Sequence, residues 1–266
     1  MSASHPLPIY CIFFFIIIII RKKQNKNLYK GHDLLRQIII MTPRLVYVEG
    51  NIGSGKSTFL NYISESSKYK DDCIVIPEPL DLWSNVQGYN LLKLYYESPK
   101  QHSATFQCHI FLTMIHRHNV MLNLIQQEEE KGKKIKIVFM ERSLESCVFC
   151  FSRVLCTRDM ISQEFQSMFE NDFGLFCGND RHHHPSPPTG TIYFQSKDIL
   201  NLKKRIMSRN RVEEKDYIED SFLSELNSVH DKLFIRDNSH IIPADMDLEI
   251  LKQHYYIPVV EKLLAC

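Results

Sequence analysis

The stretch that decides the fold reads Gly50-Asn51-Ile52-Gly53-Ser54-Gly55-Lys56-Ser57-Thr58. It matches in full the pattern G-x-x-x-x-G-K-[ST], whose glycines let backbone N–H groups turn toward phosphate oxygens. The apolar run Leu45 to Val48 leads into it, and a segment of helical period, Ser57 to Ser64, leads out. This strand–loop–helix setting predicts a phosphate-binding loop, or P-loop.

The polar residues of this loop have distinct expected roles. Lys56 is predicted to place a positive charge at the β- and γ-phosphates of a nucleotide, and the Ser57 hydroxyl to bind Mg²⁺. The start of the following helix adds its partial positive charge. We therefore take all nine residues of the motif, Gly50 to Thr58, as candidate cofactor-binding residues.

Outward from the loop, short apolar runs alternate with longer segments of helical period. Five runs rich in Val, Ile, Tyr and Phe predict strands: Leu45–Glu49, Cys73–Ile76, Ile135–Met140, Thr191–Gln195 and His240–Pro243. Helices are predicted at Ser57–Ser64, Ser103–Glu129, Leu144–Phe169, Ile199–Ser208 and Tyr217–Leu233. The alternation predicts an α/β fold with a five-stranded parallel sheet flanked by helices. In such folds the ligand lies at the carboxyl ends of the strands.

Composition narrows the range of partners. The formal net charge of +1 gives no global electrostatic reason to bind nucleic acid, so phosphate recognition is expected to be local. The eight cysteines are scattered through apolar runs, a pattern that favours a reduced intracellular compartment.

The N-terminal residues differ from the rest of the chain. Residues Ile9 to Ile20 are all apolar and are followed by Arg21-Lys22-Lys23. The run is shorter than the roughly 17–25 residues of a membrane-spanning helix, and its charge lies on the wrong flank for a secretory signal. We expect an extension at 1–40 outside the fold and one folded domain at 41–266, in a protein that starts near Met41. A cytoplasmic location is expected, with mitochondrial or membrane-anchored locations left open, and membrane contact only if the apolar run is retained.

Two acidic residues follow predicted strands. Glu78 lies between Pro77 and Pro79 after the second strand, where its carboxylate could take the proton of an attacking hydroxyl. Glu141 follows the third strand and is placed to hold Mg²⁺, with Arg142 beside it for phosphate or the acceptor oxygen. Either carboxylate alone would more often be a surface residue, but two at strand ends beside a P-loop favour function.

An arginine cluster follows the fourth predicted strand. It reads Arg205-x3-Arg209-x-Arg211-x-Glu213-Glu214. Arg205 and Arg209 share a helix face, and clustered guanidiniums suit a transferring phosphoryl group, so we predict an arginine-rich lid. The alternative is a basic, solvated helix.

A third constellation suggests a wall for an aromatic substrate. Gln107, Phe111 and Met114 are spaced i, i+4 and i+7 and share one helix face, on which the Gln107 amide could pair with a base edge. Flat apolar surfaces could come from three aromatic residues, Trp83, Phe106 and Phe151. Aromatic residues on helices are also common in ordinary cores, so for each of these residues a place in the core is about as well supported as a place in the site.

With these residues in view, the chain resembles the deoxynucleoside kinase family from about Arg44 to the C-terminus. The resemblance implies that Glu78 is the general base and that Glu141 and Arg142 act on Mg²⁺ and the 5′-oxygen. It also implies a fold of the P-loop kinase type, ATP as phosphate donor, a deoxynucleoside as acceptor, a homodimer and a role in nucleotide salvage for DNA precursor synthesis.

Further roles follow from the same resemblance. It implies that Arg205, Arg209 and Arg211 contact phosphate. Tyr96 and Glu214 would bind the sugar 3′-hydroxyl, and Gln107 would read the base.

Two positions bear on the choice of base. Deoxycytidine and deoxyguanosine kinases carry an arginine and an aspartate where this chain has Met114 and Cys147. Losing that charged pair resembles the thymidine-accepting branch of the family. We therefore expect pyrimidine deoxynucleosides, thymidine and deoxycytidine, to be preferred over purines.

Two other classes share parts of this pattern. A nucleoside monophosphate kinase, such as thymidylate kinase, would need a further basic site for the acceptor's phosphate, which the Gln107 helix does not supply. A non-catalytic kinase-like subunit would be expected to lose Lys56, Glu78 or the arginines, and all are present.

Overall fold

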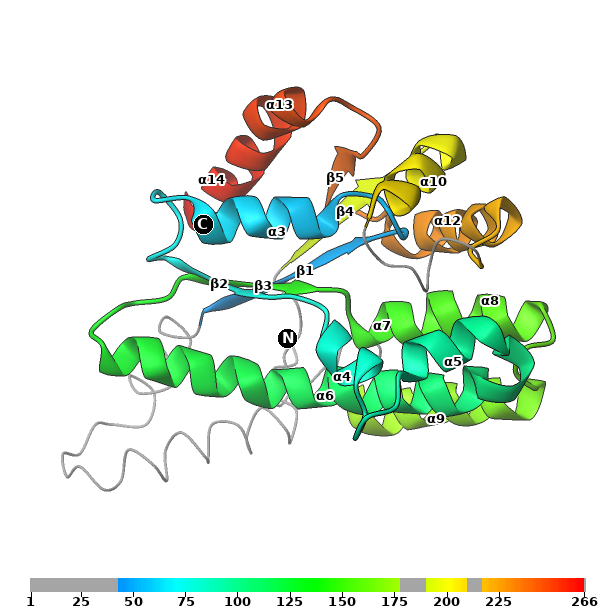
Figure 1. Cartoon of the computed structure of the whole chain (residues 1–266). Helices are drawn as coiled ribbons and strands as arrows, with labels where there is room; N and C mark the ends of the chain where they lie inside the picture. The colour runs from blue at the N-terminus through cyan, green and yellow to red at the C-terminus, as the bar shows by residue number, and fades with distance from the viewer. Residues whose placement is uncertain (1–42, 178–189, 210–216, 266) are drawn as a thin grey trace, which may run out of the picture.

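The computed structural model describes residues 43–177, 190–209 and 217–265 (Figure 1). Its centre is a sheet of five parallel strands in the order β2-β3-β1-β4-β5. The strands are β1 (Arg44–Gly50), β2 (Cys73–Ile76), β3 (Ile137–Glu141), β4 (Gly190–Gln195) and β5 (Ser239–Pro243). The predicted five-stranded parallel sheet is therefore confirmed, with each strand within two residues of its expected bounds.

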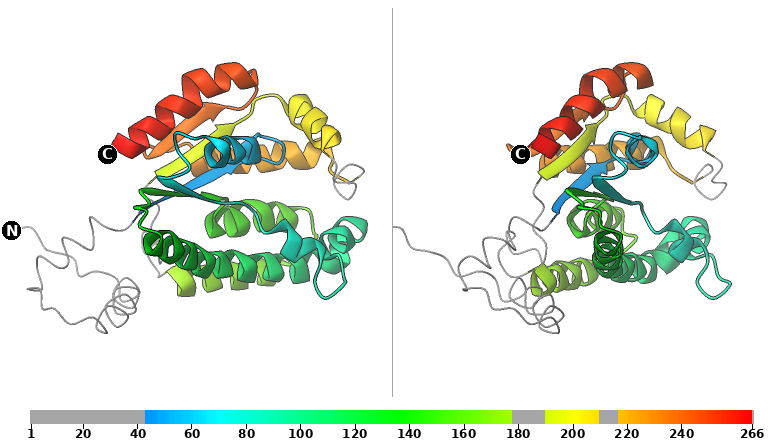
Figure 2. Two further views of the ribbon diagram at one scale, coloured as in Figure 1. Left: turned by 60° about the vertical axis from the view of Figure 1, so that its left-hand side comes forward. Right: turned by 90° about the vertical axis from the view of Figure 1, so that its left-hand side faces the viewer.

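Helices cover both faces of the sheet, as all three ribbon views show (Figures 1 and 2). One face carries α3 (Lys56–Glu65) and the C-terminal run of α13 (Leu248–Leu251), the π-helix η2 (Lys252–Tyr256) and α14 (Ile257–Ala265). The other face carries the long helix α6 (Pro99–Glu130). The order of strands and the position of β1 between β3 and β4 place the P-loop at the middle of the sheet edge.

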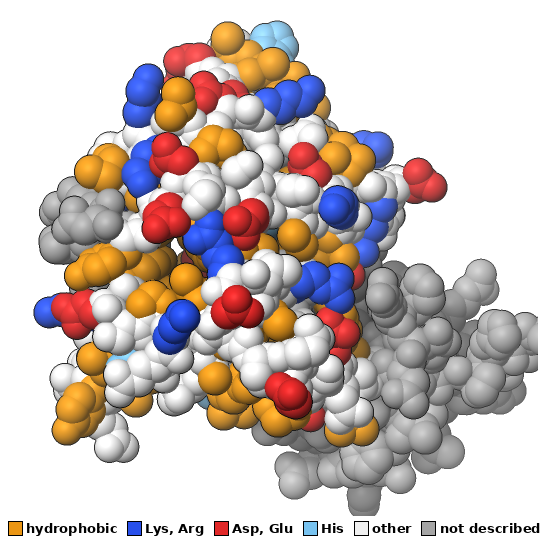
Figure 3. Space-filling model, turned by 90° about the vertical axis from the view of Figure 1, so that its right-hand side faces the viewer, with side chains coloured by type: hydrophobic (Ala, Val, Ile, Leu, Met, Phe, Trp, Pro, Cys, Tyr) orange, Lys and Arg blue, Asp and Glu red, His pale blue; other side chains and the backbone are white. Residues whose placement is uncertain are grey.

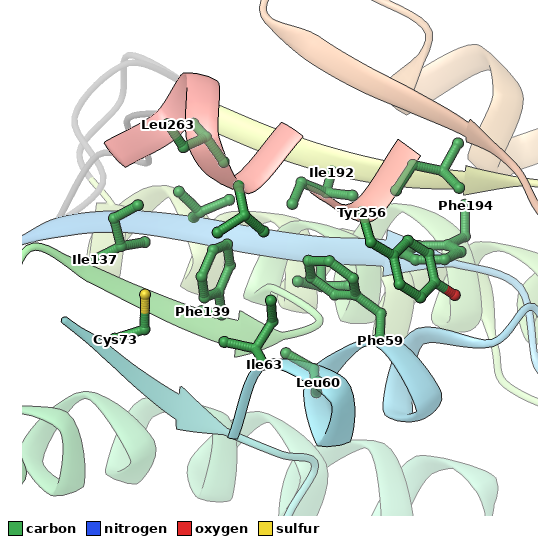
Figure 4. Packing of buried hydrophobic residues seen from close by; sticks show 14 of the residues in the cluster. Phe59, Leu60, Ile63, Cys73, Ile137, Phe139, Ile192, Phe194, Tyr256 and Leu263 are labelled. Atoms are coloured by element: carbon green, nitrogen blue, oxygen red, sulfur yellow. The ribbon is translucent and has the colours of Figure 1, made fainter. Parts of the chain in front are cut away.

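Alternation along β1 builds the two cores. Val46 and Val48 pack into the cluster with α3, whereas Leu45 and Tyr47 pack into the cluster with α6. Because successive side chains of a strand point to opposite faces, one short run serves both layers. The ring of Phe59 on α3 packs edge-on against Phe139 on β3 and against the C-terminal helices (Figure 4).

Four shorter helices complete the site end of the sheet. They are α4 (Leu80–Ser84), α5 (Leu91–Glu97), α10 (Ile199–Ser208) and α12 (Asp220–Phe234). Helix α10 has the bounds expected from the sequence. The sequence analysis did not predict α4, α5 or the C-terminal helices, because they are short or follow the last recognised strand.

The single helix predicted over Leu144–Phe169 was wrong. This segment folds as α7 (Leu144–Ser146), the π-helix η1 (Cys147–Phe151), α8 (Ser152–Thr157) and α9 (Gln163–Cys177). The chain turns between α8 and α9, where Asp159 has a φ of 54° and Ser162 Oγ accepts from the Phe165 backbone N–H. The left-handed backbone at Asp159 ends α8, and the cap at Ser162 begins α9.

Some expectations lie outside the described residues. These are the N-terminal extension at 1–40 and the lid residues 210–216. Among the helices that the structure does describe, none combines the length and apolar character needed to cross a membrane.

Candidate active site

A cavity opens at the carboxyl ends of the strands, the edge at which β1 leads into α3. It is partly open to solvent. Viewed from this side, the surface is hollowed between hydrophobic and basic side chains (Figure 3). The predicted site residues that line it are Ile52, Lys56, Glu78, Trp83, Tyr96, Phe106, Gln107, Met114, Glu141, Arg142, Cys147, Phe151 and Arg209.

The glycines of the P-loop are fixed by close approach and backbone angle. Gly50 has a φ of 144°, and a Cβ there would lie 2.7 Å from the Phe194 carbonyl oxygen on β4. Gly53 has a φ of 82°, and its Cβ would lie 2.8 Å from the Leu202 carbonyl oxygen on α10. No side chain fits at either position without moving backbone, so the loop packs directly on its neighbours.

Asn51 braces the same loop. Its Oδ1 accepts from the Ile52 backbone N–H at 2.8 Å, and its Nδ2 donates to the Leu223 carbonyl oxygen on α12 at 2.8 Å. Asn51 is fully buried, so this candidate ATP ligand shapes the loop from within. Thr58, by contrast, is exposed on α3.

Lys56 is buried beneath the loop. Its Nζ donates to the carbonyl oxygens of Gly50 at 3.1 Å and Asn51 at 2.9 Å. Burial, followed by the charge of Arg142, holds the pKa of Lys56 below its usual range. Strongly shifted pKa values are concentrated at functional sites, so the lowered pKa of Lys56 in a cavity beside the P-loop favours a functional role.

Ser57 and Glu141 meet across the base of the loop. Ser57 Oγ donates to Glu141 Oε1 at 3.0 Å, which joins the start of α3 to the end of β3. Mg²⁺ prefers hard oxygen donors and usually takes only one or two from protein, the rest from water and phosphates. A hydroxyl and a carboxylate at this distance fit such a site.

Glu78 and Arg142 form a buried ion pair at the centre of the cavity. Arg142 Nε donates to Glu78 Oε1 at 2.5 Å, and the two side chains are 8% and 14% exposed. Arg142 Nη1 also donates to the Gly50 carbonyl oxygen at 2.8 Å, and its guanidinium lies 4.6 Å from the Phe151 ring centre. The predicted base and the predicted phosphate-binding arginine therefore share one cluster with the P-loop.

The backbone of Arg142 is unusual. Its φ of 60° is in the left-handed region, which a side chain with a Cβ seldom adopts. Its N–H donates to the Val48 carbonyl oxygen at 2.9 Å, and the next residue, Ser143, caps α7. Strain of this sort persists only where surrounding contacts enforce it, and it is concentrated at functional sites.

Glu49 is a site residue that the sequence analysis missed. It is fully buried at the end of β1, and its Oε1 accepts from the Ser143 backbone N–H at 2.7 Å and from Ser143 Oγ at 2.6 Å. Burial raises the pKa of Glu49 to about 7 against the opposing charge of Arg142. The rule that found Glu78 and Glu141, an acid at the end of a strand, would have found it too.

Glu49 should make stability depend on pH. A folded-state pKa above the roughly 4.3 of an unfolded glutamate means that the folded protein binds the proton more tightly. That stabilisation is complete below the unfolded value and is lost as the pH rises through about 7. Glutamine cannot ionise at this position. Without ligand, the unfolding free energy of Glu49→Gln should therefore exceed that of wild type by up to about 3 kcal/mol as the pH rises from the unfolded pKa to about 7.

Urea denaturation across this pH range measures the difference, with the exposed Glu65→Gln on α3 as the matched control. Parallel stability curves for wild type and Glu49→Gln would contradict the assignment.

The other wall of the cavity carries the residues predicted to read a base. Gln107 and Met114 are both 2% exposed on α6, as their shared helical stripe predicted. Cys147 Sγ lies 3.6 Å from Gln107 Oε1 and donates to it. Burial raises the pKa of Cys147, so the thiol keeps its proton and can act as this donor.

Aromatic side chains frame this wall. Trp83 Nε1 donates to Thr113 Oγ1 at 2.9 Å, and the Trp83 ring meets Phe106 edge-on at 6.1 Å. Phe106 stacks on Tyr95 at 5.0 Å. Tyr96 lines the cavity and stacks on Tyr217, which follows the lid, at 6.3 Å.

The lid arginines are separated. Arg209 lines the cavity, whereas Arg205 Nη1 donates to the Ala244 carbonyl oxygen after β5 at 2.7 Å. Arg205 is therefore not among the cavity residues in this structure. Arg211 and Glu214 lie outside the described residues.

The chain is similar in sequence to known nucleoside kinases. The model of the family described as "Deoxynucleoside kinase" matches residues 46–257. Human deoxycytidine kinase is 31% identical over 208 residues, which cover 70% of this chain and 73% of the human protein. A probable deoxycytidine kinase of Fowlpox virus is 29% identical over 203 residues, with 76% of each chain covered. Human mitochondrial thymidine kinase 2 is 34% identical over 107 residues, which cover 40% of this chain and 35% of that protein.

Proposed function

Because the chain belongs to the deoxynucleoside kinase family, we propose that it transfers the γ-phosphate of ATP to the 5′-hydroxyl of pyrimidine deoxynucleosides in nucleotide salvage. The protein is a phosphotransferase that acts on a hydroxyl group, as its relatives' names indicate. Beyond this family-level activity, we propose a preference for pyrimidines, a metal site and roles for single residues.

One observation carries the proposal. A single cavity is lined by Lys56 of the P-loop, by the Glu78–Arg142 ion pair and by Gln107 of the base wall. Such a cavity can hold a phosphate donor and a nucleoside acceptor so that their reacting atoms meet. Catalysis of phosphoryl transfer consists almost entirely of positioning the reactants and stabilising the developing charge.

Each residue then has a defined task. Glu78 accepts the proton of the 5′-hydroxyl, and Arg142, which is paired with it, binds the oxygen as charge develops there. Lys56 and Arg209 contact the transferring phosphoryl group from the P-loop and from the lid. Arg211, another predicted lid arginine, lies outside the described residues.

The metal has a matching pair of oxygen ligands. Ser57 and Glu141, which lie within hydrogen-bonding distance of each other, would hold Mg²⁺. When bound, the ion neutralises charge on the β- and γ-phosphates.

The base wall supports pyrimidines. Met114, Cys147 and Gln107 line the cavity together, and Cys147 Sγ contacts the Gln107 amide. An uncharged site with one amide can pair with the edge of thymine or cytosine, since an amide offers both a donor and an acceptor.

An assay with ATP and each of the four deoxynucleosides tests the base preference. We expect higher kcat/KM for thymidine and deoxycytidine than for the purines. Met114→Ala should widen the pocket and shift this ratio toward purines by about 10–200-fold, the discrimination that a methylene or two can give. The exposed Met168→Ala on α9 is the matched control. A wild-type preference for deoxyguanosine would contradict the pyrimidine proposal and leave the kinase assignment intact.

Three further expectations extend the proposal. They are a homodimer, a cytoplasmic location and a kinase domain at 41–266, preceded by an extension that is not needed for activity. Their support is the family resemblance and the unusual composition of the first forty residues.

A further inference from the structure

Arg117 is a buried charged residue to which the proposed mechanism assigns no role. It lies on α6, three residues after Met114 on the stripe that carries Gln107, and it is 2% exposed. Its Nη2 donates to the Ile76 carbonyl oxygen at 2.9 Å, and its Nη1 donates to Met114 Sδ at 2.9 Å. Its Nε has no hydrogen-bond partner among the described residues.

This arrangement is costly as a purely structural device. A buried N–H without a partner costs roughly 1–3 kcal/mol, and a thioether is a weak acceptor. Apolar side chains of similar volume often replace buried charges with no loss of stability. An arginine at this position therefore calls for a role other than core packing.

Its two acceptors belong to two different parts of the active site. Ile76 is the last residue of β2 and is joined to Glu78 through the rigid Pro77, so a fixed Ile76 carbonyl fixes the start of the segment that carries the base. Met114 lines the cavity, and its side chain would otherwise be flexible. One planar guanidinium holds both.

We propose that Arg117 is a positioning residue that couples the base wall at Met114 to the carboxylate of Glu78. A nucleoside that seats correctly against Met114 then finds Glu78 at the distance its 5′-hydroxyl requires. The inference rests on the proposed function, since it presumes a deoxynucleoside in this cavity.

The charges nearby suit this position. Burial lowers the pKa of Arg117 to about 10, against Glu78 first and then Glu141, so the guanidinium stays charged at neutral pH. Two titratable groups of β1, Tyr47 and Glu49, also act on Arg117. Arg117 is thus a cation near Glu78 and Glu141 that does not itself line the cavity.

Steady-state kinetics of Arg117→Met and Arg117→Lys test the proposal, with selective excitation of the only tryptophan, Trp83, as a probe of thymidine binding. Arg117→Met should lower kcat/KM for thymidine about 100-fold, the usual effect of a displacement near 1 Å, and weaken thymidine binding while the KM for ATP stays the same. Arg117→Lys keeps the charge but cannot reach both acceptors, so it should restore only part of this loss.

Two controls separate positioning from folding. Arg153→Met removes an exposed arginine whose Nη2 donates to Glu170 at 2.8 Å, and it should leave both substrates unaffected. Met114→Leu keeps the volume and removes the sulfur acceptor, so the effect of Arg117→Met on thymidine binding should be smaller in that background.

The proposal is overturned if Arg117→Lys and Arg117→Met keep the thymidine binding and kcat of the wild type. It is also overturned if their losses fall equally on ATP and thymidine with a lower melting temperature, as general unfolding would produce. If Arg117→Met does not fold, Arg117→Lys and Met114→Leu decide by the same criteria. A wild-type protein that phosphorylates no deoxynucleoside contradicts the proposed function itself, before any variant is compared.

Discussion

Replacing Glu78 with glutamine is expected to lower kcat by about two to four orders of magnitude, the usual effect of losing a general base. Glutamine keeps the size of the side chain and an oxygen that can accept from Arg142 Nε, which now lies at 2.5 Å from Glu78 Oε1. What it removes is the capacity to take a proton. Nucleoside binding should therefore be largely intact, and Trp83 fluorescence can measure it independently of turnover.

The matched control is Glu97→Gln, which changes an exposed glutamate paired with Lys93 at 3.7 Å. It should turn over at the rate of the wild type. Full turnover by Glu78→Gln would refute the assignment of the base. Loss of thymidine binding together with turnover would instead make Glu78 a binding residue.

Replacing Lys56 with methionine should have two opposite effects. Turnover should fall by about two to three orders of magnitude, as when one preorganised donor to a transition-state charge is removed. The free protein should become more stable, because burial and the charge of Arg142 make the ammonium unfavourable there. Kinetics and the melting temperature without ATP measure the two effects on the same sample.

The exposed Lys93→Met, on α5, should change neither quantity. A Lys56→Met protein that is less stable and fully active would show that the lysine is structural. A gain in stability with loss of activity is the pattern of a charge kept for function at a cost in stability.

The sequence was a good guide wherever the chemistry is carried by short motifs. The P-loop residues, Glu78 and the Glu141–Arg142 pair all lie at one sheet edge, since parallel strands bring their carboxyl ends together. Burial on both faces makes the strands continuous apolar runs, which is why their bounds could be predicted closely.

Long-range geometry was less accessible. The left-handed backbone of Arg142 and the contact of its guanidinium with Phe151 depend on how η1 packs, which no local pattern specifies. The turn between α8 and α9 was missed because apolar residues continue across it with helical spacing. Arg205 had the same local signal as Arg209, yet it bonds to the loop after β5.

Two buried charged residues were also not predicted from the sequence. Glu49 and Arg117 both lie on patterns that the sequence analysis used, the end of a strand and the Gln107–Met114 stripe. Their burial depends on the packing of α6 and α7 against the sheet, so the sequence alone did not distinguish them from surface charges.

The measurement that tests the central claim most directly is the fate of the γ-phosphate of labelled ATP, given to the full chain with thymidine or with thymidine monophosphate. The structure and the family predict label in thymidine 5′-monophosphate when thymidine is the acceptor, and none in the diphosphate. Label only in the diphosphate would place the protein among the nucleoside monophosphate kinases. No transfer to either acceptor, from folded protein that binds ATP, would contradict the proposed activity.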